Sequence, residues 1–576
     1  MTRKTVAELL IDALVAMGVK RVFGVAGDSL NGITDAIRRR KGIEWVHVRH
    51  EEVAAFAAGA EAHLTGSLAV CAGSCGPGNL HLINGLYDCH RSRVPVVAIA
   101  AQVPSDEIGS NYFQETHPER LFLDYSHYCE LVSQVSQMPR TLEIAIQMAV
   151  SRKGVAVVVL PGDIALQETT TPNPRMRFRA TEPLLRPSDR DLAALAETLN
   201  TAPKVTILAG AGCAGAHAEL IEVAERLQAP IVHAMRGKEF IEYDNPFDVG
   251  MTGLLGFSSG YYAMMNCDAL LMLGTDFPYR QFFPDEGARI VQIDSRPEQL
   301  GRRAKLDLGL VGEVKATLEA LVPQLLPKQN RAHLDRCLEH YRKARQGLDE
   351  LAAGVPGKKP IHPQYVAKLV DELAAEDAVF TCDVGTPTIW AARYLRMNGK
   401  RRLLGSFNHG SMANALPQAI GAQAAFPGRE VISFSGDGGL AMLMGDVLTL
   451  SQLKLPVKIV LFNNGSLAFV ELEMKAAGIL DFATDLQNPN FAEMAKAAGL
   501  FGARVEYPED LARALREAFD YPGPALIEVL TNRQELSMPP TIELKQALGF
   551  SLYLAKAVLN GRGDEIVDLA KTNLFR

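Results

Sequence analysis

The chain has 576 residues, of which 48% are hydrophobic and 22% are charged, and its formal net charge is −7. This length suggests about three domains, and the composition is that of an ordinary globular protein. The negative charge is spread along the chain, so nucleic acid is not an expected partner. The eight cysteines lack zinc-knuckle spacing, which favours reduced thiols in a cytoplasm.

The chain begins with an amphipathic helix rather than a secretory signal. Apolar residues recur at helical spacing between Thr5 and Met17, and no signal-peptide pattern precedes them. No run reaches the roughly 18 apolar residues that a membrane-spanning helix needs. We therefore expect a cytoplasmic protein.

Strands alternate with helices through the first third of the chain. Apolar, β-branched stretches predict strands at 22–28, 43–48, 67–72, 94–101 and 154–160. The alternation indicates a parallel sheet. Glu51 lies where the second strand gives way to an Ala-rich helix, and on its own it reads as an acidic residue at a helix N-terminus.

The middle third follows a Pro-containing linker at 181–189. Strands are expected at 204–209, 230–235, 269–273 and 289–293. The segment 210–215 matches the dinucleotide pattern G-x-G-x-x-G, since it follows a strand and precedes a helix. The next strand ends without the acidic residue that would hold a ribose, so a nicotinamide-dinucleotide site is poorly supported.

The last third, after a second linker at 352–360, contains two strands that end in polar residues. Strand 430–435 leads into Gly436-Asp437-Gly438-Gly439, and strand 457–462 leads into Asn463-Asn464. Because parallel strands end at the same edge of a sheet, Asp437 and Asn464 should be neighbours. Their oxygens suit Mg²⁺, and the glycines let the backbone approach a diphosphate. An ordinary doubly wound unit with a turn Asp and a strand-end Asn is the alternative.

The GDG segment followed by the Asn pair resembles the signature of thiamine-diphosphate enzymes. The resemblance implies an α/β fold of three doubly wound parallel-sheet domains, with thiamine diphosphate and Mg²⁺ as cofactors. The expected divisions are a pyrimidine-binding domain, a central FAD-binding domain, a diphosphate-binding domain and an amphipathic helical tail, at 1–182, 183–335, 336–531 and 532–576.

The resemblance also assigns residues to the thiamine site. It selects Glu51 over Glu52 as the carboxyl group that meets N1′ of the aminopyrimidine, and Met412 as the bulky residue beneath the cofactor. Asp437, Asn464 and the Ser466 carbonyl would bind the metal. The other expected cofactor contacts are Gly410, Ser411, Gly438, Gly439, Gly465, Leu467, Ala468, Phe469 and Val470.

A substrate pocket and a flavin site are expected as well. Phe469 and Glu473, one helical turn apart, are pocket candidates, as are Phe113 and Gln114, although core packing is the alternative for Phe113. The resemblance to FAD-binding members is close over 250–294, with Asp294 holding a ribose or serving only as a strand-end cap. The other expected FAD contacts are Thr252, Gly253, Leu254, Leu255, Thr275, Asp276, Phe277, Pro278 and Tyr279.

The tail carries leucines at helical spacing, including Leu544, Leu548, Leu552 and Leu559. Such helices pack on their own protein or lie in a lipid interface. Here the chain resembles one branch of the family, the membrane-associated pyruvate dehydrogenases that use a quinone. The segments that carry this resemblance are 50–61, 73–85, 236–239, 401–414 and 549–553.

That branch implies oxidative decarboxylation of pyruvate to acetate and CO₂, with electrons passing through FAD to a quinone. It also implies a homotetramer bound peripherally, through the tail, to phospholipid at the inner face of the cell membrane. The alternatives are acetolactate synthase, a phosphate-dependent oxygen-reducing pyruvate oxidase and a non-catalytic flavoprotein sensor. The long tail favours the quinone-dependent oxidation of pyruvate over these alternatives.

Overall fold

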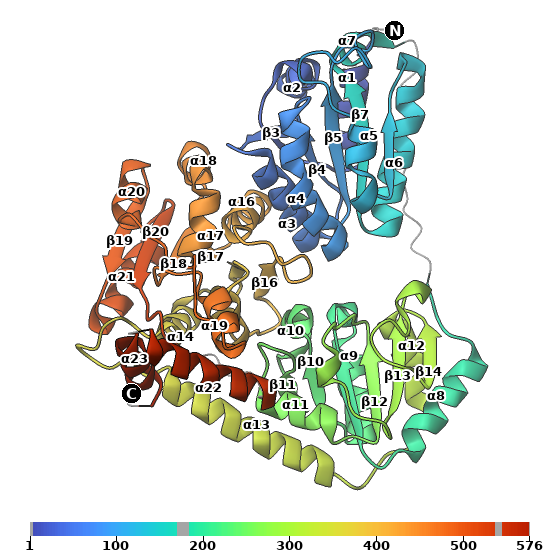
Figure 1. The fold of residues 1–576 in the computed structure, drawn as a ribbon. Helices are drawn as coiled ribbons and strands as arrows, with labels where there is room; N and C mark the ends of the chain where they lie inside the picture. The colour runs from blue at the N-terminus through green and yellow to red at the C-terminus, as the bar shows by residue number, and fades with distance from the viewer. Residues whose placement is uncertain (1–3, 170–183, 536–543, 561, 575–576) are drawn as a thin grey trace.

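Three six-stranded parallel sheets form the body of the protein (Figure 1). The computed structural model describes residues 4–169, 184–535, 544–560 and 562–574. Helices flank each sheet, and the strands at the sheet centres are buried along almost their whole length, as is typical of parallel strands covered on both faces. The predicted class of three doubly wound α/β domains is confirmed.

The first sheet has the strand order β3-β2-β4-β5-β7-β6. Its strands are β2 (Arg21–Gly24), β3 (Glu44–His47), β4 (Ala69–Gly73), β5 (Val96–Gln102), β6 (Tyr128–Leu131) and β7 (Val155–Pro161). Its main helices are α1 (Val6–Ala16), α2 (Asn31–Arg39), α3 (Glu51–Thr65), α4 (Pro77–Ser92) and α6 (Met138–Arg152). The expected strands are present, and the short edge strand β6 is an addition to them.

The middle sheet has the order β11-β10-β9-β12-β13-β14. Its strands are β9 (Val205–Ala209), β10 (Ile231–His233), β11 (Asp248–Met251), β12 (Ala269–Leu273), β13 (Arg289–Asp294) and β14 (Leu308–Val311). Its main helices are α8 (Asp189–Thr201), α9 (His217–Leu227), α10 (Lys238–Ile241), α11 (Ser258–Met265) and α12 (Val314–Leu321). The predicted boundary at 182 and 183 lies outside the described residues.

The third sheet has the order β16-β15-β17-β18-β20-β19. Its strands are β15 (Val379–Cys382), β16 (Arg402–Gly405), β17 (Val431–Gly436), β18 (Lys458–Asn463), β19 (Phe501–Val505) and β20 (Ala525–Leu530). Its helices include α14 (Pro363–Leu373), α15 (Thr386–Tyr394), α16 (Ala415–Ala425), α17 (Asp437–Met442), α18 (Val447–Leu453), α19 (Ala468–Ala476), α20 (Phe491–Ala497) and α21 (Pro508–Asp520).

One long helix, α13 (Ala332–Leu351), joins the middle domain to the third (Figure 1). Leu334 near its start is buried in the core of the middle domain. Near its end, Arg345 donates a hydrogen bond to the carbonyl of Arg393 in α15 at 2.6 Å. The boundary expected at 335 and 336 therefore falls inside this helix.

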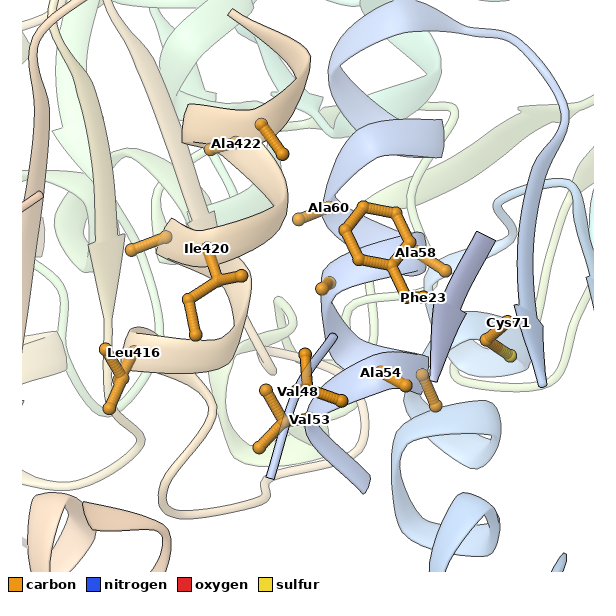
Figure 2. Close-up of a cluster of buried hydrophobic side chains, with 14 of the residues drawn as sticks. Phe23, Val48, Val53, Ala54, Ala58, Ala60, Cys71, Leu416, Ile420 and Ala422 are labelled. Atoms are coloured by element: carbon orange, nitrogen blue, oxygen red, sulfur yellow. The ribbon is translucent and has the colours of Figure 1, made fainter. Parts of the chain in front are cut away.

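The first and third domains share a core between α3 and α16, shown in Figure 2. Val53 and Ala60 of α3 and Leu416 and Ile420 of α16 all belong to this cluster. Gly421 permits the close approach, because an added β-carbon there would lie 2.1 Å from the carbonyl oxygen of Ala57. The small residues of the Ala-rich helix thus hold the two domains together.

The three domains meet at Glu239, a buried residue of α10. Its carboxylate accepts hydrogen bonds from Arg402 at 2.7 Å and from the backbone of Leu403 at 3.0 Å, both in the third domain. His63 of α3 lies 3.1 Å from the same carboxylate. One side chain of the middle domain therefore contacts both neighbouring domains.

The tail forms α22 (Leu544–Leu559) and α23 (Gly563–Leu574), which meet the third domain near α19. Tyr553 and Ala557 are buried, whereas Leu552 and Leu559 are 49% and 84% exposed. Arg562 pairs with Asp481 at 2.7 Å and fixes the turn between the helices. No helix in the described ranges is long and apolar enough to cross a bilayer.

Candidate active site

Asp437 begins α17 directly after β17, as the spacing predicts. Its carboxylate is buried and accepts hydrogen bonds from the backbone of Gly438 at 2.9 Å, the backbone of Gly465 at 2.8 Å and the amide of Asn488 at 2.7 Å. Burial raises its pKa, and these hydrogen bonds oppose that effect. Within the described residues this carboxylate has neutral donors and no ion pair, which fits a ligand for a cation.

The two asparagines at the end of β18, Asn463 within the strand and Asn464 after it, have different roles. Asn463 is buried, donates to Glu528 at 2.7 Å and accepts from Asn488 at 2.9 Å, so it anchors the strand end. Asn464 is less buried, and its amide oxygen accepts from the backbone of Ser466 at 3.0 Å. The pairing of β17 with β18 brings Asp437 to this loop. Asp437, Asn464 and the Ser466 carbonyl together offer the hard oxygen donors that Mg²⁺ requires.

Beneath Ser466 lies a buried ion pair in α19. The Ser466 hydroxyl donates to Glu471 at 2.7 Å, and Lys475 pairs with Glu471 at 2.5 Å. Arg533 donates to the same carboxylate at 3.0 Å. The Lys475 ammonium also lies 5.4 Å from the ring centre of Tyr553 in α22. The tail is thus connected to the loop that carries the candidate metal ligands Asn464 and Ser466.

Other predicted thiamine contacts gather around the same turn. An added β-carbon at Gly438 would meet Leu467 at 2.9 Å and the terminal methyl of Met412 at 3.3 Å, so these side chains line one space. Gly439 is buried, and Gly465 has φ of 66°, which lets the loop reverse direction. Ala468 and Val470 lie in the first turn of α19. Gly410 and Ser411 precede Met412, where the Ser411 hydroxyl accepts from Asn84 at 2.8 Å.

Glu51 is the first residue of α3 and its side chain is almost buried. His81 in α4, which sequence reasoning missed, places Nδ1 at 2.9 Å from the Glu51 carboxylate. The His81 ring also stacks on His50, with 4.3 Å between ring centres. A histidine three residues after the Gly76-Pro77-Gly78 turn carries no sequence signal by itself, because the contact depends on how α3 packs against α4.

The loop with Phe113 and Gln114 lies beside the turn that precedes α4. The Cys75 thiol donates to the Gln114 amide oxygen at 3.6 Å, and Gln114 has φ of 63°. Phe113 is 79% exposed, so core packing does not explain it. The described contacts place these residues with the first domain. No contact among the described residues joins Glu51 or Phe113 to Asp437 within one chain.

A large cavity of about 1390 Å³ lies between the three domains. Phe469 and Glu473 of α19 both line it, together with Gly410. All ten residues predicted to contact FAD line this same cavity: Thr252, Gly253, Leu254, Leu255, Thr275, Asp276, Phe277, Pro278, Tyr279 and Asp294. Residues 210–212 and 215 of the glycine pattern line it as well.

The charges of this cavity suit a dinucleotide diphosphate. Arg296 and Arg303 line it, and a guanidinium nitrogen of each is buried without a hydrogen-bond partner in the part of the chain described. Arg93 pairs with Asp276 at 2.6 Å across the boundary between the first and middle domains. Unpaired buried donors are costly, so their presence favours an anionic ligand that accepts from them.

Three family models match the chain in the order of its three sheets. They are the N-terminal TPP binding domain, the central domain and the C-terminal TPP binding domain of thiamine pyrophosphate enzymes, over residues 4–121, 192–321 and 383–529. Fold and site together define an enzyme that binds a diphosphate cofactor at the strand ends of a parallel sheet. The chain belongs to the thiamine pyrophosphate enzyme family.

Several relatives cover most of the chain. A putative thiamine pyrophosphate-containing protein of Bacillus subtilis is 37% identical, over 99% of each chain. A pyruvate oxidase of Lactiplantibacillus plantarum is 30% identical, over 88% of this chain and 85% of its own. An acetolactate synthase of Mycobacterium bovis is 31% identical, over 89% and 86%.

Proposed function

We propose that the protein oxidatively decarboxylates pyruvate and passes the electrons through FAD to a membrane quinone. In this reaction pyruvate, water and quinone yield acetate, CO₂ and quinol. The observation that carries the proposal is the shared cavity, in which the ten flavin candidates and the two α19 residues Phe469 and Glu473 meet. A flavin in that cavity would adjoin the thiamine-binding domain, as an oxidase requires.

Specific residues of this chain would hold the metal ion and the proton that the reaction needs. Asp437, Asn464 and the Ser466 carbonyl would hold Mg²⁺, and Glu51 would hold a proton at the ring nitrogen of the aminopyrimidine. Thiamine diphosphate, when bound, supplies the electron sink for loss of CO₂, and FAD accepts the electron pair.

The pyruvate pocket would lie beside the cofactor. Phe469, Glu473, Phe113 and Gln114 would surround pyruvate and limit the entry of water. Because the described contacts leave Glu51 and Phe113 apart from Asp437, we propose that a second copy of the chain completes the site, within a homotetramer.

The tail supports a peripheral membrane location. Its buried face uses Tyr553 and Ala557, which leaves Leu548, Leu552 and Leu559 exposed on the predicted stripe. An amphipathic helix with such a stripe can lie in a phospholipid interface, close to a quinone pool. We propose that the protein works at the inner face of the cell membrane in this way.

The test is an anaerobic reaction of the purified holoenzyme with thiamine diphosphate, Mg²⁺ and pyruvate. We expect the oxidised flavin to bleach at catalytic speed and to recover when a quinone is added. Acetolactate synthase is the second candidate, because a relative with that name is 31% identical. A flavin that stays oxidised while acetolactate accumulates would establish that reaction instead.

A further inference from the structure

Asp383 is a buried carboxylate that the proposed reaction does not use. It directly follows β15 and is 2% exposed. One carboxylate oxygen accepts the backbone N–H of Ala415 at 3.0 Å, and the other accepts that of Gly436 at 3.1 Å. Each oxygen therefore holds a different segment of the chain.

These two segments lie on either side of the thiamine site. Gly436 directly precedes Asp437, the metal-ligand candidate, and Ala415 follows the segment that carries Met412. Asn414 strengthens the second connection, because its amide donates to the carbonyl of Cys382 at 2.9 Å and accepts from the backbone of Val384 at 3.3 Å. The end of β15 is thus the common support of both segments.

Gly439 shows how closely the carboxylate fits beneath the Gly436–Gly439 turn. An added β-carbon at Gly439 would lie only 2.3 Å from the Asp383 carboxylate oxygen. The sequence pattern attributes this glycine to the approach of a diphosphate. The structure adds a second reason, since any side chain here would displace the carboxylate and the turn above it.

The chemistry of the contact requires a carboxylate. Two N–H donors approach from different segments, so two acceptor oxygens are needed, and an asparagine would offer one oxygen and one clashing NH₂ group. Asp383 forms no ion pair in the described ranges, and burial raises its pKa to about 7, so its ionised form is costly here. A residue that served only general packing would not need to bear this cost.

We propose that Asp383 is a positioning residue that sets the spacing between the segment that carries Met412 and the Gly436–Gly439 turn, and thereby shapes the site for thiamine diphosphate and Mg²⁺. The proposal depends on membership of the thiamine family and not on the oxidase reaction. If the oxidase reaction is disproved, the role of Asp383 can still hold, and the reverse is also true, because cofactor binding is measured without turnover.

The test is Asp383→Asn, examined by calorimetric titration of the apoprotein with thiamine diphosphate and Mg²⁺. Loss of an outer contact of this kind weakens binding roughly 10- to 100-fold, so we expect the cofactor Kd to rise by that factor. The KM for pyruvate at saturating cofactor should stay unchanged, a split that general destabilisation would not produce.

The matched control is Asp371→Asn, which removes another buried carboxylate of the same domain. Asp371 pairs with Arg396 and Arg401, both at 2.7 Å, and contacts neither segment. We expect this variant to unfold more easily yet to keep its cofactor Kd. A Kd for Asp383→Asn within twofold of the wild type would overturn the proposal.

Gly439→Ala provides a second route if Asp383→Asn fails to fold. It keeps the carboxylate but pushes a methyl group against it, so the cofactor Kd should again rise. If Asp383→Asn does not fold, an unchanged cofactor Kd in Gly439→Ala would overturn the proposal.

Discussion

His81 Nδ1 lies 2.9 Å from the carboxylate of Glu51, and the two residues come from the adjacent helices α3 and α4. His50, the N-cap of α3, stacks on the face of the same imidazole and accepts from the backbone of Glu52 at 3.2 Å. Burial, followed by the neighbouring His81, lowers the pKa of His50, so His50 favours its neutral form. The carboxylate proposed to meet the cofactor is therefore held in place before a cofactor arrives.

Glu51→Gln should abolish most turnover. An amide cannot give or take the proton that the aminopyrimidine nitrogen needs, and such proton transfers contribute roughly 10²- to 10⁴-fold. We expect kcat to fall by that factor, measured as quinone-dependent pyruvate consumption. The control is Glu52→Gln, whose carboxylate contacts Asn84 instead, and it should lose far less activity. Equal pyruvate turnover in Glu51→Gln and the wild type would disprove the assignment.

Arg303→Met should weaken FAD binding. The buried guanidinium nitrogen of Arg303 lacks an acceptor in the described protein, so a bound diphosphate would supply one. A hydrogen bond to a charged group contributes about 1.5–3 kcal/mol, or roughly 10- to 100-fold in Kd. Fluorescence titration of the apoprotein with FAD measures the effect. Arg302→Met, next to it but exposed, is the control, and an equal loss in both variants would contradict this role.

The sequence predicted the sheet centres better than the sheet edges. β5, β7, β12 and β17 are buried, largely apolar segments, and their positions agree closely with the expected strands. β6 and β14 are edge strands of four residues each. β6 (YCEL) contains a charged residue and β14 (LGLV) contains a glycine, and both are too short to show a repeating pattern that identifies a strand. The pairing of an edge strand is decided by its neighbour, which one short segment does not encode.

The same limit applies to the site. Asp437 and Asn464 were predictable because strand ends of one parallel sheet must meet, and β17 and β18 are neighbours. His81 and Asp383 were not, because both act through contacts between elements that are distant in the sequence. The tail was only partly predictable, since Tyr553 rather than the leucine stripe forms its buried face.

Glu239→Gln should remove a pH dependence of stability. Burial alone would raise the pKa of Glu239, but His63 and Arg402 outweigh it and lower the pKa from 4.5 to about 2. A carboxyl group whose pKa is lower in the folded state stabilises it above the unfolded pKa. This contribution, about 3 kcal/mol at neutral pH, is lost as the pH falls from 4.5 towards 2.

Urea unfolding at pH 7, 5 and 4 would measure the effect on the free energy of unfolding. We expect the gap between the wild type and Glu239→Gln to be largest at pH 7 and to begin closing between pH 5 and 4. A gap that widens as the pH falls would show that Glu239 is not held ionised by its neighbours.

Leu552→Asp and Leu559→Asp should weaken binding to phospholipid vesicles. Both side chains are exposed on the tail helix α22, so the substitutions should leave folding and lipid-free activity unchanged. Burying a leucine in an apolar phase contributes about 1.5–3 kcal/mol, so each change should cost roughly tenfold or more in vesicle affinity. Co-sedimentation measures the affinity, and Leu326→Asp, at an exposed leucine of the middle domain, is the control. If both tail variants bind vesicles as tightly as Leu326→Asp does, the stripe is not the lipid contact and the peripheral membrane location loses its structural support.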